Sequence, residues 1–140
     1  MNTKEKVQTL VYYNNLIREA TTKYEQKFMA STQNLSTMCV NVLTTIGVHK
    51  SCTQSTIAKS VSLTPGSITQ IIDKLELKNL VKRQRCKVDR RKIYVALTAK
   101  GKKIYDLRMH GIESVFREWL SRLTSQEQEM LLTIMAKIAQ

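Results

Sequence analysis

The sequence contains few residues that break helices and few that favour β-structure. Its 140 residues include one proline and four glycines, and aromatic residues make up 6% of the chain. Few segments combine β-branched residues with turn signals, so the composition predicts long helices. It argues against an all-β barrel or sandwich.

Groups that carry catalysis or hold metals are also scarce. The two histidines, His49 and His110, lie in no nucleophile or metal-ligand motif, and no glycine-rich phosphate loop is present. Cys39, Cys52 and Cys86 are widely spaced with no CxxC pair, which argues against a disulfide framework or a zinc site. We therefore expect no enzymatic activity, no metal and no cofactor.

Long apolar runs are missing as well. No run approaches the roughly 18 residues that a membrane span requires, and the first six residues are polar, unlike a signal peptide. We expect a cytoplasmic protein with no membrane partner. The length of 140 residues suits a single domain, with or without an oligomerisation extension.

Positive charge is abundant and concentrated in one stretch. The formal net charge is +12, and the stretch from Lys74 to Lys103 holds twelve Lys or Arg and only two acids, Glu76 and Asp89. Such a stretch suits phosphate contacts, because each neutralised phosphate releases condensed counterions. DNA, RNA and an anionic membrane all remain possible partners by charge alone, and a solvated charge run is the alternative.

Apolar periodicity predicts two helices in the first third of the chain. The spacing is helical over about residues 3–29, and it resumes from Met38 to Ile46 after a polar break. Gly47 is the expected C-terminal stop of the second helix.

Two shorter helices are expected next. Thr53 suits the N-cap of a helix that runs to Val61, and Thr64 suits the N-cap of another helix with Pro65 at its first position. This second helix ends near Asn79, a residue that tolerates the left-handed conformation. The pair predicts a helix-turn-helix, although any αα-hairpin would show the same pattern.

The following segment favours that interpretation. Residues 80–86 and 93–97 alternate and are rich in Val, Ile and Tyr, and the polar stretch 87–92 joins them, which predicts a β-hairpin with a basic tip. A hairpin directly after a helix-turn-helix is the wing of a winged-helix domain. The expected fold class is therefore mainly α with a small β-hairpin wing (α+β).

The C-terminal third predicts two more helices. Thr98 precedes a helix over residues 99–123, and Thr124 with Glu127 forms a capping box before the last one. The apolar stripes of the first, fifth and sixth helices would stay exposed unless they pack together. We expect one domain over residues 1–140, with a DNA-binding lobe at 35–98 and dimerisation helices at 1–30 and 99–140.

Residues 54–83 and 88–101 resemble the MarR family of bacterial winged helix-turn-helix regulators. The order of elements matches along the whole chain, and the most specific signal is Asp89-x-Arg91 followed by Leu97-Thr98 and Gly101. The resemblance implies a homodimeric transcriptional regulator of pseudo-palindromic double-stranded DNA, most often a repressor. The alternatives are a transcriptional activator or anti-silencer of the same fold, and a nucleic-acid-binding or assembly module without ligand control.

The resemblance also implies roles for individual residues. Arg91 would enter the minor groove while Asp89 holds it by a salt bridge, and an exposed turn salt bridge is the alternative interpretation of this pair. The expected DNA-binding residues are Thr64, Ser67, Thr69, Gln70, Lys74, Arg83, Arg85, Lys87, Asp89, Arg90, Arg91 and Lys92. Many relatives carry Arg in place of Gln70 and Gly in place of Asn79, so base preference and the turn into the wing are expected to differ.

MarR-like repressors are commonly released by small aromatic or phenolic molecules. Tyr12, Tyr13 and Met38 are candidates to line such a pocket, although aromatic and Met residues at helical spacing more often belong to a core. Some relatives sense oxidants through a cysteine in the first helix, which has none here. We expect Cys39 on the second helix and Cys86 on a wing strand, and we expect thiol control to be minor.

Overall fold

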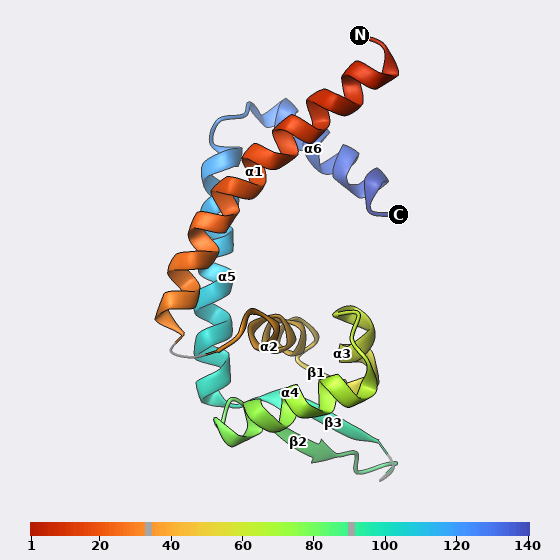
Figure 1. Cartoon of the computed structure of the whole chain (residues 1–140), viewed down its shortest axis with the longest axis vertical. Helices are drawn as coiled ribbons and strands as arrows, with labels where there is room; N and C mark the ends of the chain where they lie inside the picture. The colour runs from red at the N-terminus through yellow and green to blue at the C-terminus, as the bar shows by residue number, and fades with distance from the viewer. Residues whose placement is uncertain (33–34, 90–91) are drawn as a thin grey trace. The chain divides into compact units, whose positions relative to one another are not determined.

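The computed structural model of the protein describes residues 1–32, 35–89 and 92–140. It confirms the expected mainly helical fold with a small wing (Figure 1). The elements are α1 (Thr3–Ser31), α2 (Thr37–His49), β1 (Ser51–Thr53), α3 (Gln54–Ser60), α4 (Pro65–Leu77), β2 (Val81–Arg85), β3 (Ile93–Leu97), α5 (Ala99–Leu120) and α6 (Ser125–Ile138). The chain forms two compact units, a central unit of Glu25–Arg108 and a terminal unit of Met1–Tyr24 with Met109–Gln140.

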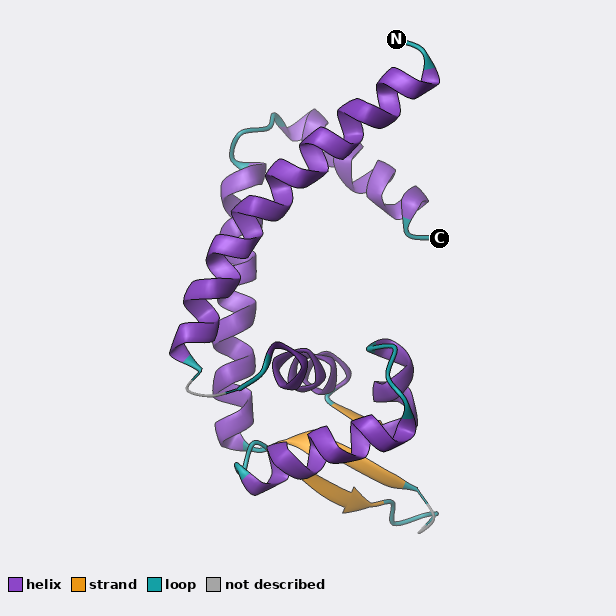
Figure 2. Ribbon diagram, viewed as in Figure 1, coloured by secondary structure: helices purple, strands orange, loops and turns teal. Residues whose placement is uncertain are grey.

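The central unit contains a small antiparallel sheet with the strand order β1-β3-β2 (Figure 2). β2 and β3 form the expected hairpin, in which Arg83 lies opposite Val95. The sequence analysis missed β1, a strand of three residues that pairs Cys52 with Val95 on the other edge of β3. Three residues are too few for alternation to be recognised.

The core of the central unit lies between the sheet and the helices α2, α3 and α4. Its fully buried side chains are aliphatic and come from all of these elements. They include Val42, Leu43, Ile46, Ile57, Ile72, Leu75 and Val95, each 0% exposed. Because α4 buries one face in this core, its opposite face is left exposed to solvent.

The helix ends follow the sequence closely in three places. The side chains of Thr53, Thr64 and Thr124 each accept a hydrogen bond from a backbone N–H in the first turn of the next helix. The capping box is present, and the hydrogen bonds that Thr124 donates lower the pKa of Glu127. Asn79 adopts the expected left-handed conformation, with φ of 57°.

Two expected helix ends were wrong. The last residue of α2 is His49, and Lys50, with φ of 60°, is its C-cap. Gly47 therefore does not end the helix. A Cβ on Gly47 would lie 2.3 Å from the Cδ2 atom of Tyr105, so this glycine admits an aromatic ring against the helix. α5 ends at Leu120 rather than at residue 123.

A half-buried arginine holds the last turns of α1 against the rest of the central unit. Arg108 on α5 donates to Glu25 on α1 at 3.0 Å, and to Asn41 and Thr44 on α2 at 3.1 and 2.9 Å. Its guanidinium also lies 6.0 Å from the centre of the Phe28 ring. Three helices therefore share one cation, which the sequence pattern did not identify.

The turn from α4 into the wing packs tightly against the start of α5. The hydroxyl of Thr98 donates to the Asn79 carbonyl at 2.7 Å and accepts from the Gly101 N–H at 3.1 Å. The Thr98 N–H donates to the Leu80 carbonyl at 3.0 Å. A single threonine therefore caps α5 and attaches it to both the end of α4 and the root of the wing.

The terminal unit exposes many apolar side chains. No described residue of α6 is buried, and Phe28 is the only buried residue in the described part of α1. Within this unit the Tyr24 ring packs closely on α5, where a Cβ on Gly111 would lie 1.9 Å from its hydroxyl. The exposed apolar residues include Val7, Leu10, Val11, Leu16, Ile17, Phe116, Met130, Leu131, Leu132, Ile134, Met135 and Ile138. In the described ranges, none of the helices has the length and apolar character needed to cross a bilayer.

We expect Gly101→Ala to destabilise the protein by about 1 to 3 kcal/mol or more, the cost of overpacking a close contact. A Cβ at this position would lie 1.9 Å from the Leu80 carbonyl oxygen, which belongs to the wing root and cannot move alone. Thermal and urea unfolding followed by circular dichroism measure the change. Gly66→Ala is the matched control, because nothing lies within 4 Å of its Cβ, and it should be neutral or stabilising. Equal stability of the two variants would contradict this account of the junction.

Candidate nucleic-acid interface

Positive charge is distributed unequally between the two units. Sixteen of the 23 Lys and Arg residues lie in the central unit, but only five of the 11 acidic residues do. The terminal unit is nearly neutral by the same count. A polyanion would therefore be attracted to the central unit, which carries the helix-turn-helix and the wing.

The start of α4 is shaped by two hydroxyl groups. Thr64 accepts from the Ser67 N–H at 3.2 Å, and the two hydroxyls lie 2.9 Å apart. Thr64 is exposed and Ser67 is half-buried, and Pro65 occupies the first helical position. Both expected site residues therefore lie at the exposed N-terminus of α4, and each has a local hydrogen-bond partner.

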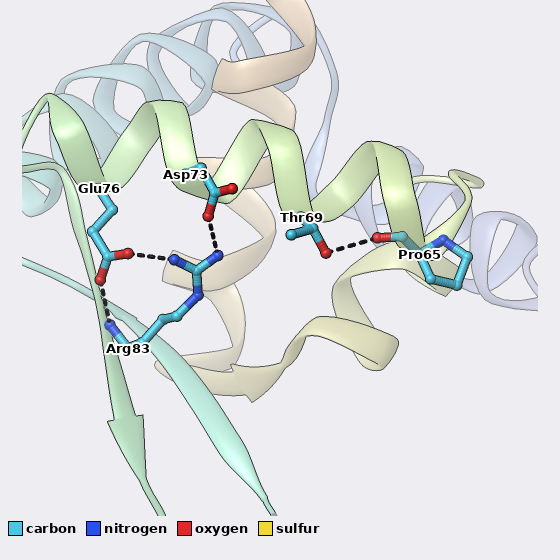
Figure 3. A network of polar contacts seen from close by, with 5 residues as sticks. All are labelled: Pro65, Thr69, Asp73, Glu76 and Arg83. Carbon is cyan, nitrogen blue, oxygen red and sulfur yellow. Dashed lines mark hydrogen bonds and ion pairs between the residues drawn. The ribbon is translucent and has the colours of Figure 1, made fainter.

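The exposed face of α4 carries the next three expected residues. Thr69, Gln70 and Lys74 are exposed. Ile68 and Ile72, on the buried face of the same helix, are 1% and 0% exposed. The Thr69 hydroxyl donates to the Pro65 carbonyl at 2.9 Å (Figure 3). Because that proton is already engaged, Thr69 offers a partner its methyl group and an acceptor oxygen.

The wing carries basic side chains toward its tip. Arg85, Lys87 and Lys92 are exposed, and the hairpin end is closed by the Cys86 N–H, which donates to the Lys92 carbonyl at 2.9 Å. Val88 is 97% exposed. The described part of the wing tip thus combines positive charge with one uncovered apolar side chain.

The other three expected wing residues are Asp89, Arg90 and Arg91. Asp89 is half-buried, and its backbone carbonyl accepts from the Lys92 N–H at 3.0 Å. Arg90 and Arg91 lie outside the described residues, so the pairing of Asp89 with Arg91 stays a prediction.

Arg83 differs from the other expected DNA-binding residues because acidic side chains surround it. One terminal nitrogen of its guanidinium donates to Asp73 and the other to Glu76, both on α4 (Figure 3). The backbone N–H of Arg83 also donates to Glu76, at 3.3 Å. A residue of β2 is therefore attached to two successive turns of α4.

The charge of Arg83 is secured by this arrangement. Partial burial by itself lowers the pKa of its guanidinium, but the hydrogen bonds and negative charges of Asp73 and Glu76 outweigh burial, so the pKa is raised. The side chain of Arg83 is 26% exposed, against 54% for Asp73 and 40% for Glu76. Sequence reasoning placed Arg83 among basic residues and missed that its partners lie seven and ten positions earlier.

A hollow of about 340 Å³ between α3 and α4 adds groups that the sequence analysis did not select. It borders Thr69 and is also lined by Gln54, Ser55 and Lys59. The Nε2 atom of Gln54 is buried and has no hydrogen-bond partner among the described residues. In a helix-turn-helix the first helix, here α3, crosses the nucleic-acid backbone. That general geometry could have identified the polar residues of α3 from the sequence.

Comparisons with known proteins agree with this geometry. The family model described as MarR family matches residues 35–93. The chain is 30% identical over 135 residues to the HTH-type transcriptional regulator YwhA of Bacillus subtilis (strain 168), which spans 90% of this chain and 94% of that protein. The chain belongs to the MarR family.

Two further relatives extend the comparison. The HTH-type transcriptional repressor MdtR of Bacillus subtilis (strain 168) is 34% identical over 99 residues, or 71% of this chain and 64% of that protein. The crystal structure of a mutant MarR from E. coli complexed with operator DNA has the same fold, with a TM-score of 0.65 and 19% identity over 99% of both chains.

The residues considered for ligand and redox control in this MarR-family chain belong to both units. Tyr12 and Tyr13 are both exposed in the terminal unit, with ring centres 5.4 Å apart, while Met38 belongs to the central unit. A pocket shared by the three stays a prediction. Cys39 and Cys52 are 8% and 5% exposed, and burial raises the pKa of the Cys52 thiol, which disfavours its reactive thiolate.

Proposed function

We propose that this MarR-family protein is a sequence-specific repressor of transcription that binds a pseudo-palindromic duplex operator as a homodimer. The observation that carries the proposal is the exposed polar face of α4 beside a basic wing, on the unit that holds most of the positive charge. A helix of this kind fits the major groove, and a hairpin beside it reaches the neighbouring backbone and minor groove.

Base reading is assigned to Thr69 and Gln70. A glutamine amide pairs with N6 and N7 of adenine, and a threonine methyl group contacts the methyl group of thymine. Both side chains are exposed, and the Thr69 hydroxyl proton is engaged by Pro65, so its methyl group is the part that suits a base. We therefore propose that α4 prefers A·T pairs at the positions that these two residues face.

Phosphate binding is assigned to the cationic residues around α4 and the wing tip. Lys74, Arg85, Lys87 and Lys92 are exposed and suit the DNA backbone, as do the Thr64 and Ser67 hydroxyls at the start of α4. Arg90 belongs with the phosphate-binding residues by its sequence position. Arg91 is proposed to enter the minor groove with Asp89 as its support, which the resemblance implies and the negative potential of narrow A·T-rich grooves favours.

The comparisons support this reading at two levels. MarR of E. coli has been solved with operator DNA, and its fold covers 99% of this chain. MdtR is named as a repressor, and its 34% identity to this chain supports repression over activation here. A small aromatic or phenolic ligand is the proposed signal for release.

The homodimer is proposed from the terminal unit. Its exposed Leu, Ile, Met and Val residues would each gain roughly 1.5 to 3 kcal/mol on full burial, and α6 buries no described residue within the chain. A second copy of the same unit is the simplest cover for such a surface. A homodimer carries two copies of α4, one for each of two half-sites about 10 base pairs apart.

The function is tested by competition among nucleic acids. A fluorescent duplex selected by the protein from a random-sequence pool should be displaced by unlabelled duplex of the same sequence, and far less by either single strand or by duplex RNA. Fluorescence anisotropy measures the displacement. Equal competition by single strands or by RNA would contradict the proposal and favour an RNA-binding or assembly module.

Gln70→Ala and Lys74→Ala should fail in different ways on this selected duplex. Loss of a base contact at Gln70 should cost about 1 to 3 kcal/mol and relax preference at specific positions. Loss of a phosphate contact at Lys74 should weaken binding to all sequences alike. It should also reduce the slope of log affinity against log salt concentration by about one unit. Titrations of point-substituted duplexes at several salt concentrations measure both effects. If Gln70→Ala keeps every base preference of the wild type, α4 does not read bases through this residue.

The dimer is expected to dissociate when charge is placed on the apolar surface of α6. Leu131→Glu combined with Ile134→Glu should shift the protein toward monomer at micromolar concentration, because two glutamates cannot be buried without partners. Val48→Glu is the matched control, since Val48 is an exposed aliphatic residue of the central unit, 60% exposed. Size-exclusion chromatography with light scattering reports the mass. A double variant that remains as dimeric as the control would place the interface elsewhere.

A further inference from the structure

The Arg83 guanidinium is occupied by protein groups on both sides. The two terminal nitrogens of the guanidinium donate to Asp73 and to Oε2 of Glu76. The backbone N–H of Arg83 donates to the other carboxylate oxygen of Glu76, Oε1. Two carboxylates bind one cation, so these three side chains together carry a net charge of −1. A phosphate would have to displace these carboxylates against their repulsion, which makes Arg83 a poor backbone ligand despite its place in the basic stretch.

The same contacts allow Arg83 to hold β2 at a fixed position relative to α4. An arginine fork binds two oxygens in a fixed plane, so it fixes the direction of both partners as well as their distance. The wing is already attached at its root by Thr98, whose hydroxyl and N–H bind Asn79 and Leu80. On the edge of β3 opposite the one that pairs with β1, Arg83 adds a second attachment that joins β2 directly to α4.

This second attachment matters because the tip is distant from the root. At about 3.3 Å per residue, Lys87 lies some 13 Å along the chain beyond Arg83, so a small rotation at the root becomes a large displacement at the tip. A wing that reads a groove must keep its tip in register with the bases read by α4.

We propose that Arg83 is a positioning residue that fixes the wing relative to α4, with Asp73 and Glu76 as its anchors. The inference rests on the proposed function, since it concerns how the wing is presented to the minor groove. It assigns a role to two acidic residues on a DNA-facing helix, where negative charge would otherwise only oppose binding.

Neutralising Asp73 and Glu76 should have an effect on DNA affinity that charge alone does not predict. Asp73→Asn with Glu76→Gln removes two negative charges from α4, and charge alone predicts tighter binding to every duplex. Loss of the anchors predicts instead that the contribution of the wing tip disappears. Arg83→Lys keeps the positive charge but lacks the planar fork. DNA binding would therefore tolerate the substitution if Arg83 bound a phosphate, but not if Arg83 positions the wing.

The experiment measures how much Arg91→Ala costs in each background, on the duplex selected by the wild type. In the wild type we expect Arg91→Ala to weaken binding about five-fold or more. In Arg83→Lys, and in Asp73→Asn with Glu76→Gln, the same change should cost less than about two-fold, since the tip is no longer held in place. Glu76→Gln alone is the milder variant if the double substitution unfolds, as followed by circular dichroism.

Asp106→Asn is the matched control. It breaks an exposed ion pair between Lys102 and Asp106 in the same unit, 2.7 Å long, and should leave the cost of Arg91→Ala unchanged. The proposal is overturned if Arg83→Lys retains the full Arg91 dependence, or if the charge-neutral anchors bind all duplexes more tightly with that dependence intact. A wild type that binds no duplex selectively, or for which Arg91→Ala costs nothing, overturns the proposed function as well, and the wild-type titrations alone reveal it.

Discussion

The close approach of α5 to the root of the wing is the constraint on which the central unit depends. The Leu80 carbonyl occupies the space that a side chain at position 101 would fill, and Thr98 binds both this carbonyl and the end of α4. Three elements thus meet at one backbone segment with no room for adjustment. The direction of the recognition helix, the start of the hairpin and the start of α5 are all set together there.

Charge in the central unit follows from this geometry. The junction places α4 and β2 side by side, and Asp73 and Glu76 of α4 then form ion pairs with Arg83 of β2 (Figure 3). Because strand side chains alternate, Lys82 and Gln84 fall on the other face. Neighbouring basic residues in a single stretch therefore have different surroundings, some open to a polyanion and one enclosed by carboxylates.

Much of the fold was predictable because its signals are local. The threonine caps, the proline at the start of α4, the capping box before α6 and the left-handed Asn79 all act within a few residues of chain. Where the prediction failed, a distant residue decided the outcome. Gly47 looked like a helix stop, but α2 continues to His49, and the glycine instead leaves room for the ring of Tyr105, 58 positions away. β1 needed β3 as a partner before three residues could form a strand.

By itself the sequence determined the order of the six helices and the hairpin, the family signature and the concentration of basic residues, because periodicity, caps and composition are written along the chain. It also selected the exposed residues of α4, since a helix with one buried face must expose the other. Only the tertiary structure decided which charges are free to meet DNA. The partners of Arg83 on α4, like those of Arg108 on α1 and α2, are brought close by packing, and no spacing along the chain distinguishes an enclosed arginine from an open one.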